Sequence, residues 1–184
     1  MVMSINFEYA QYELYDRLSN NCIEYLMNNN EDIWKLLKYT GNNPLSNSNL
    51  TLSEKRALIY SGQPDTTDYR VFLDRGQDDA ITETQCILKV SPYAIKPLSH
   101  TNGKVSMLFE IYCSYKINHI TVDDYHTTRI DCLMKNLILT LNGADITGLG
   151  RISLNSKQSY SDGAKAYGSV PWKGSWLVMS NNMG

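Results

Sequence analysis

The sequence predicts an α+β protein: a mostly antiparallel sheet with one long amphipathic helix packed on it, an N-terminal helical segment and an extended C-terminal arm. Residues 105–117 alternate apolar and polar side chains, as in a half-buried strand. Residues 128–141 repeat apolar side chains with a period of 3.6, as in a helix with one buried face. The last thirty residues are rich in Ser, Gly, Asn and Lys. The predicted parts are a helical segment at 1–61, a core domain at 62–156 and an arm at 157–184.

Three helices are expected in the N-terminal segment. A loose apolar stripe predicts the first helix, through Ala10, Leu14, Leu18 and Cys22. The stretch EDIWKLLKY at 31–39 predicts the second, because its acids come first and its lysines later, as the helix dipole favours. Thr51 and Glu54 form a capping-box pattern that begins a third helix at 52–60, and Gly62 ends it.

Beyond residue 62 the periodicity becomes that of strands. Strands are expected at 69–74 and 82–90, and a long loop with two prolines at 91–104. The strand at 105–117 has a second face that is not simply polar, because Leu108 and Tyr112 lie among Ser, Glu and Lys. We therefore expect part of this face to be covered, within the fold or in an assembly.

The helix at 128–141 has local signals at both ends. Thr128 and Asp131 resemble a capping box, and Gly143 is placed for a left-handed C-cap. Its apolar stripe consists of Ile130, Leu133, Met134, Leu137, Ile138 and Leu141. A helix of this pattern packs most economically on the apolar side of the sheet.

Three glycines in LNGADITGLGRISL, residues 141–154, raise the possibility of a phosphate-binding loop. Such a loop needs a lysine and a helix that starts directly after it. Here Leu149 follows Gly148, the helix comes before Gly143, and a short strand follows Gly150. We therefore expect a glycine turn, with nucleotide binding as the alternative.

A second candidate site is the cluster of His119, Asp123, Asp124 and His126. These residues could provide nitrogen and oxygen ligands for a metal ion. The spacing matches no ligand pattern on one face of an element, so a solvated loop is favoured. No nucleophile motif is present in the sequence either. We expect no enzymatic activity, no cofactor and no metal, and a small metal- or nucleotide-binding enzyme is the alternative.

Composition limits the classes of partner. The net charge is −2 and the basic residues are scattered, which disfavours sequence-specific binding to nucleic acid. The sequence has no long apolar run and no basic-then-apolar N-terminus, so neither a membrane span nor secretion by that route is expected. The cysteines are predicted to be buried free thiols in a reducing compartment: Cys22, Cys86, Cys113 and Cys132.

The C-terminal arm contains the residues that we predict to form an assembly interface: Tyr167, Trp172 and Trp176. Aromatic side chains are the commonest anchors in protein interfaces, and this segment has too little contiguous apolar sequence for a core of its own. The alternative is an edge strand and loop that close the same domain.

The order of segments resembles neck, or head–tail connector, proteins of tailed bacteriophages. The resemblance covers roughly residues 30–155, from IWKLLKY through LTLSEKRALIYSGQ and LFEIYCSYKI to TRIDCLMKNLILTLNGADITGLGRISL. Residues 105–154 are similar to the tail-terminator and tail-completion type of fold. The sequence departs from small members of that group in its helical segment at 7–61 and its aromatic tail.

The resemblance implies a structural virion protein that forms a homo-oligomeric ring joining portal and head to tail. Its implied partners are further copies of itself and portal or other neck and tail proteins. DNA would pass through the ring without sequence-specific binding. The implied location is the virion, after assembly in the host cytoplasm.

Overall fold

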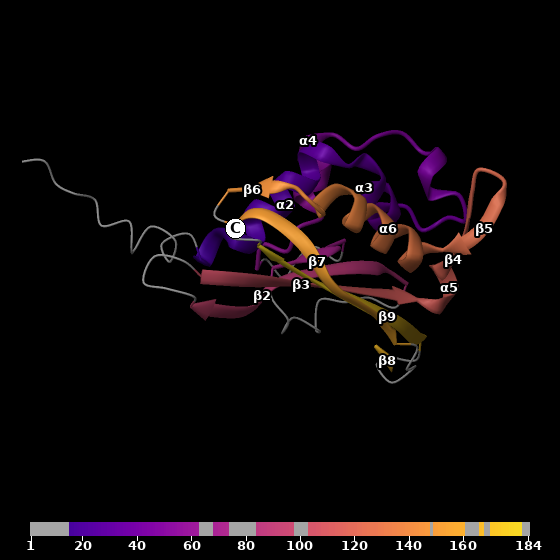
Figure 1. The fold of residues 1–184 in the computed structure, drawn as a ribbon. Helices are drawn as coiled ribbons and strands as arrows, with labels where there is room; N and C mark the ends of the chain where they lie inside the picture. Colours follow the sequence, from indigo (N-terminus) through magenta and orange to yellow (C-terminus); the bar gives the residue numbers. More distant parts are fainter. Residues whose placement is uncertain are drawn as a thin grey trace, which may run out of the picture.

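The structure is a computed structural model that describes residues 15–62, 68–73, 84–97, 103–147, 149–160, 166–167 and 170–181. Figure 1 shows a layer of helices lying over one face of a curled sheet. The helical elements are η1 (Tyr15–Arg17), α2 (Leu18–Asn29), α3 (Glu31–Lys38), η2 (Pro44–Ser46), α4 (Leu52–Ala57), α5 (Tyr115–Asn118) and α6 (Arg129–Leu141). No helix in the described ranges combines the length and the apolarity that a membrane crossing requires.

The sheet has strand order β1-β2-β3-β9-β7-β6, and β8 pairs with β9 beside this path. Its strands are β1 (Val71–Phe72), β2 (Cys86–Pro97), β3 (Gly103–Ser114), β6 (Asp145–Ile146), β7 (Gly150–Tyr160), β8 (Ala166–Tyr167) and β9 (Val170–Asn181). β1 runs parallel to β2, whereas the other pairs are antiparallel, so the sheet is mixed. A separate hairpin of β4 (His119–Val122) and β5 (Tyr125–Thr128) projects from one end of the molecule (Figure 1).

The predicted architecture of one long helix on a mostly antiparallel sheet is wrong. The helix expected at 128–141 forms as α6 but has only 13 residues, and it shares the covering of the sheet with α2 and α3. The physical reason is width. A helix with its side chains is about 10 Å across, and strands lie about 4.8 Å apart, so one helix covers roughly two strands of a much wider sheet.

The prediction that the chain ends in an extended arm outside the sheet is also wrong. β9 lies inside the sheet, hydrogen-bonded to β3 on one side and to β7 on the other. It is therefore neither a free arm nor an edge strand. The loop expected at 91–104 is instead largely strand, because β2 continues to Pro97 and β3 begins at Gly103.

The N-terminal helices follow the local signals. Within the described residues α2 begins at Leu18, after η1; the earlier part of the predicted first helix lies outside them. At α4, the Thr51 hydroxyl accepts from the backbone N–H of Glu54, and the Glu54 carboxylate accepts from that of Thr51, which confirms the capping box. The third helix is shorter than the predicted 52–60 and does not end at Gly62, because α4 ends at Ala57 and Ile59 pairs with Val71 in a β-bridge. Gly143 has a φ of 86°, the left-handed conformation predicted after the helix at 128–141.

The main core fills the space between helices and sheet. It contains the inward residues of β3, namely Met107, Phe109, Ile111 and Cys113, packed with the apolar faces of α2, α3 and α6. The opposite face of the sheet holds a smaller buried cluster of Tyr69, Phe72, Ile87, Tyr112 and Trp172. The prediction that part of the second face is covered is therefore confirmed within the fold.

Candidate functional site

The three aromatic residues predicted to form an assembly interface occupy different environments. Trp172 is only 1% exposed and packs with Tyr112 in the smaller cluster. Trp176 is half-buried opposite Glu110. Tyr167 lies in β8, and its side chain is outside the described residues. The structure does not bring the three into one exposed surface, and their role in assembly stays a prediction.

The residues of the 119–126 cluster lie on the β4–β5 hairpin rather than in a loop. His119 and His126 line a hollow of about 390 Å³ together with Asn42 and hairpin threonines. His126 Nδ1 lies 3.3 Å from the Thr121 hydroxyl. Asp123 and Asp124 form the turn at the hairpin tip, away from that hollow. Among the described residues, no group of three or more potential metal ligands comes together.

The glycine loop uses its backbone to turn the chain. The backbone N–H of Gly143 donates to Ile152 O at 2.8 Å, and that of Leu149 donates to Ile146 O at 2.8 Å. Gly150 has a φ of 64°, whereas Gly148 lies outside the described residues. These N–H groups are engaged by carbonyls in the turn, so they are not presented to an anion.

Arg129, the first residue of α6, links that helix to the end of α3 and to α5. Its side chain is 0% exposed, and in the described part of the chain no carboxylate pairs with it. The guanidinium donates to backbone carbonyls in the 36–41 segment and in α5: to Leu36 and Tyr39 (2.7 Å each), Gly41 (2.9 Å) and Ile117 (3.0 Å). The first two belong to the C-terminal end of α3, where unpaired carbonyls and the helix dipole favour a cation. Arg129 therefore holds the base of the hairpin in place.

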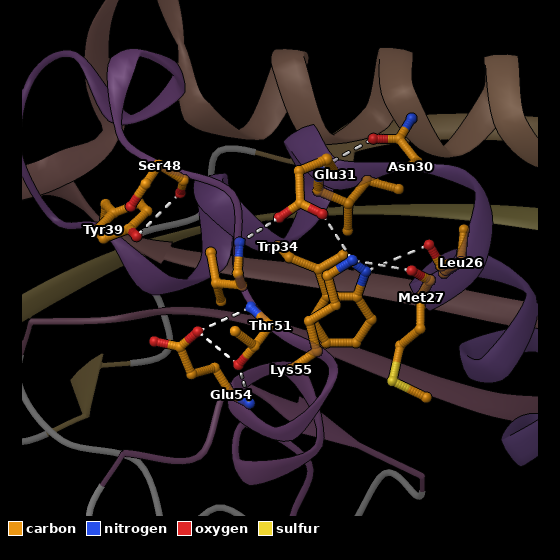
Figure 2. Close-up of polar contacts among 12 residues, drawn as sticks. Leu26, Met27, Asn30, Glu31, Trp34, Tyr39, Ser48, Thr51, Glu54 and Lys55 are labelled. Atoms are coloured by element: carbon orange, nitrogen blue, oxygen red, sulfur yellow. Dashed lines mark hydrogen bonds and ion pairs between the residues drawn. The ribbon is translucent and has the colours of Figure 1, made fainter.

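A buried ion pair fixes α4 against the helices below it. Figure 2 shows Lys55 reaching both the Glu31 carboxylate, at 2.6 Å, and the carbonyl of Met27, at 2.9 Å. The other Glu31 oxygen accepts from the backbone N–H of Leu50 at 2.7 Å. Nearby, the Trp34 indole donates to Leu26 O at 3.3 Å. Each of these polar groups has a partner within the chain, which indicates a structural role.

The hairpin and α6 enclose the most distinctive surface feature, which we call the hairpin groove. It is an open groove of about 560 Å³ that also includes residues of α3 and η2. Its rim carries two large apolar side chains in contact with solvent, Leu139 (69% exposed) and Tyr125 (48% exposed). The full lining is Asp32, Asn43, Leu45, Ser46, Val122, Asp123, Tyr125, Cys132, Lys135, Asn136 and Leu139.

Exposed apolar side chains beside a groove are typical of a protein-binding surface. Sequence reasoning missed this site, although one signal was present. Leu139 lies outside the apolar stripe of its helix, and an apolar residue on the solvent-facing side of an amphipathic helix needs another explanation.

The comparisons with known proteins concern most of the chain. No curated protein matches it. The model of the YomW family matches residues 30–173, which run from α3 to the first residues of β9 and include α6 and the hairpin. YomW is a Bacillus phage-region-like protein family, which agrees with the phage origin that the sequence resemblance implies. The match covers well over half of the sequence, and the chain therefore belongs to the YomW family.

Proposed function

We propose that this protein is a structural virion protein that forms a homo-oligomeric ring in the neck of a tailed bacteriophage. Its partners would be neighbouring copies in the ring and the portal or tail proteins that the ring joins. It would assemble in the host cytoplasm and remain in the virion. Membership of a phage-region-like family and the sequence resemblance to neck proteins both support a phage role.

The observation that carries an assembly role is the hairpin groove. Leu139 and Tyr125 leave apolar surface in water at a concave site, and burying that surface against another protein is favourable. In the part of the chain that the structure describes, the potential catalytic groups lack a comparable arrangement. The two histidines face threonines and an asparagine, and the glycine turn uses its own N–H groups.

The proposal is tested on phage particles. Virions of a phage that encodes this chain are purified, and the protein is located by mass spectrometry and by antibody labelling in the electron microscope. Labelling confined to the junction of head and tail is expected. A protein absent from purified virions would contradict the proposed function, and so would labelling elsewhere on the particle.

A further inference from the structure

The molecule has two chemically different ends. Figure 1 shows the β4–β5 hairpin at one end of the long axis, whereas β2 ends and β3 begins at the other. We call these the acidic end and the basic end from the side chains described next. Both ends carry exposed aromatic side chains, Tyr125 at the acidic end and Tyr93 at the basic end.

The acidic end presents carboxylates beside the hairpin groove. Asp123 and Asp124 form the exposed turn, and Asp32 lines the groove together with Asp123. The one lysine that lines the groove, Lys135, offsets only part of this charge. The acidic end thus combines the hairpin groove, the apolar side chains on its rim and an excess of negative charge.

The basic end carries lysines instead of carboxylates. In residues 91–97 and 103–106 the charged side chains are Lys96 and Lys104, and these ranges contain no carboxylate. Tyr93 is 58% exposed and lies where the pairing of β2 with β3 shifts register between Pro92 and Ala94. A bulge of this kind redirects a side chain away from the regular sheet surface. The basic end thus carries an exposed aromatic ring and, farther toward the end of the same strand pair, two lysines that lie opposite each other.

We propose that the hairpin groove of one copy receives the basic end of a second copy, in a head-to-tail contact. Lysines would face the hairpin carboxylates, and Tyr93 would pack against Leu139 and Tyr125. Pairing of two acidic ends would bring like charges together, so electrostatics disfavour a symmetric dimer through this surface. Head-to-tail contacts close into rings when the rotation between copies allows it. The inference rests on the proposed function for the ring's place in the neck, but the contact is tested separately.

Charge reversal at each end tests the contact. The acidic-end variant carries Asp123→Asn with Asp124→Lys. Asn is used at residue 123 because its φ of 49° is tolerated by Asn and strained for Lys. The basic-end variant carries Lys96→Glu with Lys104→Glu. Sedimentation velocity of the full chain should show assembly for wild type, at least ten-fold weaker assembly for either variant alone, and recovery when the two variants are mixed.

Recovery on mixing identifies the pairing, because each variant alone brings like charges together, whereas alternating copies of the two variants restore opposite charges at every contact. Variants that assemble like wild type would overturn the inference, as would a mixture that fails to recover or a wild-type chain that remains monomeric. Labelling at the neck together with charge-insensitive assembly would retain the proposed function and reject this contact. Labelling away from the neck, with recovery on mixing, would do the reverse.

Replacing exposed apolar side chains with serine gives a second test, one that does not depend on charge. Leu139→Ser and Tyr93→Ser should each weaken assembly at least ten-fold while leaving the urea midpoint unchanged, since both side chains are already largely in water. Leu52→Ser is the matched control, because Leu52 is 45% exposed on α4, away from both ends. Equal effects of Leu52→Ser and Leu139→Ser would overturn the inference.

Discussion

Phe109 of β3 lies directly opposite Leu177 of β9, and both side chains are fully buried in the main core. The pairing joins residues 68 positions apart in the sequence, so β9 completes a core that the preceding residues cannot close alone. Removing β9 would expose the edges of both β3 and β7 and the apolar residues that pack against it. The C-terminal residues are therefore part of the folding unit.

The first prediction is that a chain truncated after residue 156 does not fold cooperatively. Urea unfolding followed by far-UV circular dichroism should show no sigmoidal transition. Leu177→Ala in the full chain should reduce the free energy of unfolding by about 2–5 kcal/mol, as for other buried leucines. Trp176→Ala is the neighbouring control on the other face of β9, where a half-buried side chain should cost less. A truncated chain that unfolds cooperatively would show that β9 is dispensable.

The helices could be predicted from the sequence because their signals are local. A capping box requires residues three positions apart, and an amphipathic stripe is contained within one helix. The start of α4 was therefore predicted correctly from Thr51 and Glu54, and the start of α6 from Thr128 and Asp131. The positive φ of Gly143 follows from the same kind of short-range pattern.

The place of β9 could not be predicted because strand pairing depends on distant residues. Its small residues also disguise it. Ser175 and Gly174 lie opposite Ile111 and Tyr112 of β3. The large side chains of this part of the sheet therefore come from β3, and at these two positions β9 lacks the bulky residues that usually indicate a strand. The groove was missed for a similar reason, since Leu139 and Tyr125 become neighbours only through the packing of the hairpin beside α6.

The second prediction concerns the ion pair between Lys55 and Glu31. Lys55→Met keeps most of the apolar stem but leaves the Glu31 carboxylate and the Met27 carbonyl without the ammonium group. Loss of one partner of a buried pair costs about 3–5 kcal/mol, and the partial exposure of Glu31 should reduce this to about 2 kcal/mol. Urea unfolding measures the loss. Arg56→Met, which affects an exposed pair on the same helix, should change stability by less than about 0.5 kcal/mol; equal losses would contradict the prediction.

The third prediction concerns Arg129. Arg129→Lys preserves the positive charge. A lysine ammonium group, however, cannot donate at once to carbonyls of the 36–41 segment and of α5 as the planar guanidinium does, so several buried carbonyls lose their donor. Unsatisfied buried groups cost about 1–3 kcal/mol each, and we expect a total loss of at least about 3 kcal/mol. Hydrogen exchange should become faster at Thr121, whose N–H donates to Asn42 O at 2.7 Å. Lys135→Arg on the exposed side of α6 is the control, and unchanged exchange at Thr121 in Arg129→Lys would show that the hairpin does not depend on this side chain.

The fourth prediction concerns the cysteines, which are all free and buried, as the sequence predicts. Burial in the main core raises the pKa of the Cys22 thiol from its ordinary value of 9.0 to about 12. The folded protein therefore holds this proton more tightly than the unfolded chain. The resulting stabilisation is complete below pH 9 and is lost as the pH rises from 9 toward 12. At pH 10, ionisation of the unfolded thiol alone should lower the free energy of unfolding by about 1.4 kcal/mol.

This loss is measured by urea unfolding of wild type and Cys22→Ala at pH 8 and pH 10. Other groups that titrate in this range contribute to both proteins, so the difference between the two pH dependences isolates Cys22. Cys22→Ala should be less stable than wild type at pH 8, because it removes a buried sulfur from the core. The gap between the two proteins should narrow by about 1.4 kcal/mol at pH 10. A gap that stays constant would mean that the Cys22 thiol ionises equally well in the folded protein, which is incompatible with its burial on the core-facing side of α2.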